Sequence, residues 1–233
     1  MTRSVCIFGD SHAAALRKSI RNFRRMDNTI EIDFWVNAAK KFRRVHFKDG
    51  ALRPDDEGAA QSFANTNSAG RRFLHVDDYQ SIVFVGARVD PNSLLFELAA
   101  AISQKPAPIT SDYAAACLYE RFCGHRPYQY ACTMAGYKKA DIYWSPISLP
   151  TNVGQDVPYG FDVRASTPFL DKMWATFAER VAADGITFIK QDPTTVTRGI
   201  FTDQKFGLEN DNHHKNSDYG MVVLQQISSV VRR

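Results

Sequence analysis

Residues 5–12, Val-Cys-Ile-Phe-Gly-Asp-Ser-His, constrain the fold of this chain more than any other stretch. Four apolar residues run directly into a Gly-Asp turn, and the good helix formers of residues 13–18 follow. This pattern predicts a buried strand, a tight turn and a helix whose first turn carries Ser11. In open α/β folds such a residue lies over the carboxyl edge of a parallel sheet, where ligands bind and where free helix N–H groups favour a developing oxyanion. The alternative is that Asp10 or Ser11 only caps the helix.

The composition is that of an ordinary globular protein. The chain has 233 residues, of which 44% are hydrophobic and 23% charged, and this suits one α/β domain. No apolar run approaches the roughly 20 residues that span a bilayer, and no apolar leader precedes the first strand. The four cysteines form no C-x-x-C pair, which indicates reduced thiols and no zinc site. We therefore expect a soluble cytoplasmic protein without a membrane partner.

Basic residues cluster in two short segments, residues 21–25 and 40–44, and the net charge is +4. Such clusters can attract a nucleic acid or an anionic substrate. No zinc-finger, RNA-recognition or helix-turn-helix pattern accompanies them. We therefore interpret them as solvated surface and expect no nucleic-acid partner.

The chain alternates apolar segments with helix-forming ones, which predicts a parallel sheet covered on both faces in one domain, residues 1–233. Residues 40–80 are an irregular excursion, with a hairpin turn at Asp49-Gly50 and a short helix within residues 55–65. Dinucleotide and P-loop nucleotide motifs are absent, so we expect no cofactor. The predicted strands are residues 5–8, 30–36, 81–86, 141–146 and 186–189.

Two further segments are predicted as loops. The first, residues 124–128, belongs to the tyrosine-rich stretch 105–137, whose aromatic side chains suit core packing better than a substrate wall. The second, residues 192–216, leads into a last helix that Asn216 or Ser217 can cap.

Asp211 and His214 stand three residues apart in that second loop. A carboxylate at this spacing can accept a hydrogen bond from one imidazole nitrogen and leave the other free to take a proton from a serine hydroxyl. Adjacent histidines, here His213 and His214, seldom converge on one ion without other ligands, so we expect no metal. A solvated polar loop without function is the alternative for this segment alone.

Taken together, the two ends of the chain resemble a known superfamily. Gly9-Asp10-Ser11-His12 and Asp211-x-x-His214 are similar to the first and last sequence blocks of the SGNH/GDSL hydrolases, and Asn216 with Tyr219-Gly220 resembles a bacterial branch. The resemblance implies a flavodoxin-like, three-layer α/β/α sandwich with a five-stranded parallel sheet of order 2-1-3-4-5. It also implies Ser11 as nucleophile, His214 as base and Asp211 as the partner that orients the base.

The middle of the chain departs from the superfamily pattern. The second block supplies a Gly whose N–H helps bind the oxyanion, and here Ala38 stands in the corresponding turn. The third block is Gly-x-Asn-Asp, and here Gly86 is followed by Arg88 in the Asn position. Ala38 can still donate its backbone N–H, and Arg88 can donate to an oxyanion or bind an anionic group of the substrate. The backbone N–H of Ser11 is the remaining oxyanion donor.

These residues predict an enzyme, a serine hydrolase acting on an ester. Families of this kind often remove O-acyl groups from carbohydrates, so a small-molecule or carbohydrate ester is the expected substrate. An acyltransferase would use the same residues with an alcohol as acceptor. A catalytically silent binding protein of the same fold is the alternative from another class, because of Arg88 and the missing second-block Gly.

Overall fold

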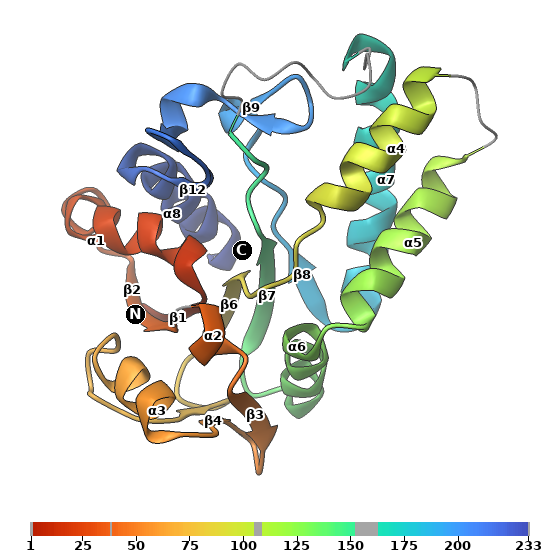
Figure 1. The fold of residues 1–233 in the computed structure, drawn as a ribbon. Helices are drawn as coiled ribbons and strands as arrows, with labels where there is room; N and C mark the ends of the chain where they lie inside the picture. The colour runs from red at the N-terminus through yellow and green to blue at the C-terminus, as the bar shows by residue number, and fades with distance from the viewer. Residues whose placement is uncertain (1, 38, 105–108, 152–162, 233) are drawn as a thin grey trace.

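The computed structural model describes residues 2–37, 39–104, 109–151 and 163–232 (Figure 1). Its centre is a sheet of five strands, all parallel, in the order β2-β1-β6-β7-β8. The predicted α/β class with one central parallel sheet is therefore confirmed. Its strands are β1 (Arg3–Gly9), β2 (Ile30–Val36), β6 (Ser81–Gly86), β7 (Asp141–Pro146) and β8 (Ile186–Phe188).

Helices flank the sheet on both faces (Figure 1). Val5 and Ile7 of β1 pack into a cluster with α1 and α8, whereas Cys6 and Phe8 pack with α4 to α7. All four side chains are buried, which explains why the first strand reads as one continuous apolar run. The helices are α1 (Ala14–Met26), α4 (Asn92–Gln104), α5 (Ser111–Cys123), α6 (Arg126–Tyr137), α7 (Val163–Ala183) and α8 (Ser217–Val231).

The excursion after β2 folds into a small antiparallel sheet of order β3-β4-β5. Asp49 and Gly50 both have positive φ, 50° and 73°, as a tight two-residue hairpin turn requires, so the predicted hairpin is confirmed. The predicted short helix is also present, and Asp56 caps it. The elements are α2 (Ala39–Phe42), β3 (Val45–Lys48), β4 (Ala51–Pro54), α3 (Glu57–Ala64) and β5 (Leu74–His75).

The loop predicted at residues 124–128 is wrong for most of its length. Helix α6 begins at Arg126 with Pro127 in its first turn, where the missing N–H of proline costs nothing and its fixed φ suits a helix. Tyr128 is 1% exposed, and its hydroxyl donates to Asp184 at 2.8 Å. The preference for core packing over a substrate wall is thus confirmed for Tyr128.

The loop predicted at residues 192–216 also needs correction, because short strands and turns occupy much of it. Asp211 and His214 lie on β12, which pairs antiparallel with β11. Asp and Asn, and to a lesser degree Lys, are depleted in strands, so the local pattern does not indicate this pairing. The elements are η2 (Pro193–Thr195), β9 (Val196–Thr197), β10 (Phe201–Thr202), η3 (Gln204–Phe206), β11 (Gly207–Leu208) and β12 (Asp211–Lys215).

Within the described ranges, no helix is both long enough and apolar enough to cross a bilayer.

Candidate active site

The segment that follows β1 and the segment that precedes α8 meet at the carboxyl edge of the sheet. Ser11 follows β1 and opens a short 3-10 turn, η1 (Ser11–Ala13), which continues into α1. His214 precedes α8, which packs against α1 (Figure 1). At Gly220 a Cβ would meet the backbone of Ala15, so the two helices are in close contact there. Asn216 caps α8 by accepting from the backbone N–H groups of Asp218 and Tyr219. Because α8 packs closely on α1, the strand β12 that precedes α8 lies next to Ser11 at the start of η1.

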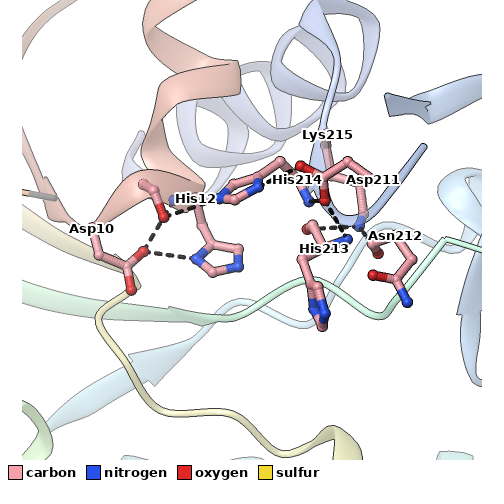
Figure 2. Close-up of polar contacts among 8 residues, drawn as sticks. Asp10, His12, Asp211, Asn212, His213, His214 and Lys215 are labelled. Atoms are coloured by element: carbon pink, nitrogen blue, oxygen red, sulfur yellow. Dashed lines mark hydrogen bonds and ion pairs between the residues drawn. The ribbon is translucent and has the colours of Figure 1, made fainter. Parts of the chain in front are cut away.

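Ser11, His214 and Asp211 form a continuous chain of hydrogen bonds. His214 Nε2 lies 3.1 Å from Ser11 Oγ, and His214 Nδ1 lies 2.7 Å from Asp211 Oδ2 (Figure 2). Since a carboxylate only accepts, Nδ1 carries the proton in the neutral ring and Nε2 is free to accept from the serine hydroxyl. The three residues selected from the sequence are thus brought together in the arrangement that nucleophilic catalysis requires.

Backbone geometry keeps Asp211 ionised. Its Oδ1 accepts the backbone N–H groups of His213 at 2.8 Å and His214 at 2.9 Å. The bond from the His214 N–H is the largest cause that holds the Asp211 pKa well below its usual range, and it outweighs the opposing effect of burial. At neutral pH this carboxylate is therefore available to orient the His214 ring.

His213 has a different place from its neighbour. Its side chain is exposed and points away from the His214 ring (Figure 2). No group of three or more His, Cys, Asp or Glu side chains in the described part of the chain is arranged to hold a metal ion.

Lys215, next to His214, is 5% exposed and bonds to its own strand. Its Nζ donates to the carbonyl oxygens of Asn212 at 3.2 Å and His213 at 2.9 Å. Burial lowers the pKa of Lys215 to about 8, against the opposing charge of Asp211. These two bonds tie the Lys215 side chain to the backbone between Asp211 and His214.

Asp10, considered from the sequence as a cap, does cap the turn that begins at Ser11. Its side chain accepts from the backbone N–H of His12 at 3.0 Å. The cap is therefore Asp10, and the hydroxyl of Ser11 is left to meet His214.

Asp10 also forms a second carboxylate–imidazole pair, which the sequence reasoning missed. Asp10 is fully buried, and its Oδ1 lies 2.8 Å from Nδ1 of His12. The His12 ring stacks on His214, with centroids 5.5 Å apart and planes at 28°. Burial would raise the Asp10 pKa, but the bonds from His12 and from the Arg88 N–H leave it below its usual value. The Asp-x-His spacing beside the serine was the available signal.

The structure describes three of the four predicted oxyanion positions, Ser11, Gly86 and Arg88. Ala38 lies outside the described residues. Gly86, Ala87 and Arg88 all have positive φ, 68°, 49° and 61°, a conformation that costs energy for the two non-glycine residues. A Cβ on Gly86 would lie 2.8 Å from Asp10 Oδ1, so glycine is required there.

Arg88 is attached to the site through its backbone. Its N–H donates to Asp10 Oδ2 at 3.0 Å, so that N–H is not free for an oxyanion. Across the described ranges, its guanidinium has neither a hydrogen bond nor an ion pair with another residue.

Comparison with protein-family models finds no match, and comparison with curated proteins finds no significant match.

Proposed function

We propose that this protein is a serine ester hydrolase of the SGNH/GDSL type, with Ser11 as nucleophile, His214 as base and Asp211 as its orienting partner. The observation that carries the proposal is the 3.1 Å contact between His214 Nε2 and Ser11 Oγ. These two residues are 203 positions apart in the sequence, and each had been selected from its local motif alone. A silent binding protein has no need to keep the nucleophile, the base and the carboxylate in contact.

The order of the sheet supports the topology that the superfamily resemblance implies. Counted in chain order among the five parallel strands, β2-β1-β6-β7-β8 reads 2-1-3-4-5. In such doubly wound sheets the ligand site lies at the carboxyl edge, where the strand order reverses. Ser11 follows β1, which has β2 as its neighbour on one side and β6 on the other, so that the strand order reverses beside it. We therefore propose a flavodoxin-like sandwich as the scaffold.

The proposed reaction proceeds in two steps through an acyl-enzyme. Ser11 Oγ attacks the ester carbonyl while His214 Nε2 takes the hydroxyl proton, and the tetrahedral intermediate then expels the alcohol, which leaves with one proton. Water, or an alcohol in a transferase, attacks the acyl-enzyme next, and Ser11 recovers its proton. The backbone N–H of Ser11 and the side chain of Arg88 are the proposed oxyanion donors. An O-acylated carbohydrate is the proposed substrate class.

The cysteines support an intracellular location as a further proposal. All four are free, and Cys6 is completely buried in β1. Free thiols persist in the reducing cytoplasm, where we place this protein.

A fluorophosphonate probe tests the proposed function. We expect it to label the wild-type protein at one serine, identified as Ser11 by peptide mapping. Ser11→Ala should take up no label, and His214→Ala should be labelled far more slowly, because the hydroxyl loses its base. Failure of the wild-type protein to react, or labelling at another serine only, would contradict the proposal.

Substitution of Arg88 separates its two possible contributions. If the guanidinium donates to the oxyanion, Arg88→Ala should lower kcat for short neutral esters by about 10²-fold, the scale for one such donor. If it binds an anionic substrate group, neutral esters should be nearly unaffected and anionic esters should show a raised KM. Steady-state kinetics with both ester classes distinguish the two. No change with either would make Arg88 a structural residue.

A further inference from the structure

His12 lies beside Ser11 in sequence and beside His214 in space. Its Nδ1 is 2.8 Å from the buried Asp10 carboxylate. No described residue forms a hydrogen bond with its Nε2. Figure 2 shows one ring nitrogen of His12 bonded to Asp10 and the other on the side of the ring away from Asp10, and the ring stacks on that of His214. The Asp10 carboxylate therefore orients the His12 ring, and the His12 side chain keeps 12% of its surface exposed.

The proton positions on the two rings follow from their carboxylates. Asp10 accepts from Nδ1 of His12, as Asp211 does from Nδ1 of His214, so any second proton on either ring resides on Nε2. A proton on His12 Nε2 would therefore lie on the side of the ring opposite Asp10, beside the ring of His214 that acts as base toward Ser11. Two stacked imidazolium rings would repel each other.

We propose that His12 is a second catalytic residue, the general acid that protonates the leaving alcohol while His214 acts as base toward Ser11. This proposal rests on the proposed function, since it assigns a further role within the same site. It differs from a simple triad, in which one histidine would both accept the serine proton and deliver it to the leaving group.

The proton balance of the two-histidine cycle closes. In acylation, His214 Nε2 takes the Ser11 proton as the Oγ–carbonyl bond forms. The C–O bond to the alcohol then breaks as His12 Nε2–H gives its proton to the departing oxygen. The positive charge has then passed from His12 to His214. In deacylation, neutral His12 takes a proton from the incoming water or alcohol, and His214 returns its proton to Ser11 Oγ.

Leaving-group dependence tests this role. A p-nitrophenolate departs readily without a proton, whereas an ethoxide needs one. We expect His12→Asn to lower kcat/KM for ethyl acetate by about 100-fold or more, the scale of general acid catalysis, and to lower it much less for p-nitrophenyl acetate. The kcat/KM for p-nitrophenyl acetate divided by that for ethyl acetate should therefore be about 10-fold or more higher in His12→Asn than in the wild type.

Asparagine is chosen because it separates the acid from the structural contact. Its amide N–H lies where Nδ1 lies, so it retains the bond to Asp10 but has no counterpart of Nε2. If His12 only supports Asp10 and the turn, His12→Asn should restore most of the activity that His12→Ala loses, with both esters. Fluorophosphonate labelling of Ser11 in His12→Asn verifies that the variant is folded.

The outcomes distinguish this inference from the proposed function. An unchanged ratio in a variant whose Ser11 still accepts the label, whether neither ester or both are equally affected, would overturn the role of His12 and leave the triad standing. A wild-type protein that neither takes the label nor hydrolyses either ester would overturn the proposed function and this inference together.

Discussion

Ser11→Ala and His214→Ala should each abolish nearly all ester turnover, by about 10⁴-fold or more in kcat. The double variant should be hardly worse than either single one, because Ser11 Oγ and His214 Nε2 act as one unit across a 3.1 Å contact. Steady-state kinetics of the three variants measure this directly.

His213→Ala is the matched control for this set. His213 is the exposed neighbour of His214, and only its backbone meets Asp211 and Lys215, so its truncation should cost little. Thermal denaturation should show that all four proteins are folded. Losses in Ser11→Ala and His214→Ala that multiply in the double variant would show that the two residues act independently, against the proposed triad.

Gly220→Ala should lower the free energy of unfolding by about 1–3 kcal/mol or more, the cost of overpacking a tight contact. A Cβ at this position would lie 2.2 Å from the backbone oxygen of Ala15 and 2.7 Å from Ser19 Oγ. Because the nearest obstacle is backbone, α8 must move away from α1. Since His214 stands just before α8, ester turnover should fall as well.

Gly136→Ala is the matched control, since Gly136 also lies within a helix but a Cβ there would meet nothing within 4 Å. Alanine should stabilise that helix by about 0.5–1 kcal/mol relative to glycine. Urea denaturation of both variants and the wild type gives the comparison. A Gly220→Ala protein that is as stable as Gly136→Ala would mean that the two helices are not held together by this close approach.

The sequence by itself determined the central sheet and most of the helices. The strands were readable because residues such as Val5, Ile7 and Phe8 are buried on both faces, and a strand of that kind leaves a continuous apolar run. Local hydrogen-bonding preferences were equally readable: Asn216 caps α8, and Asp49-Gly50 forms the hairpin turn. Ser11, Asp211 and His214 could be selected as candidates because each belongs to a short motif with its own chemistry.

The contacts between these segments were decided only by the tertiary structure. The stacking of His12 on His214 and the acceptance of the Arg88 N–H by Asp10 join residues that are distant in sequence, and no local pattern encodes them. The same holds for the pairing of β12, whose polar residues have little strand preference of their own. The periodicity of apolar residues indicates which face of a helix or strand is buried, but not which element packs against it. The contact of His214 with Ser11 depends on the close approach of α8 to α1 at Gly220, which only the tertiary structure shows.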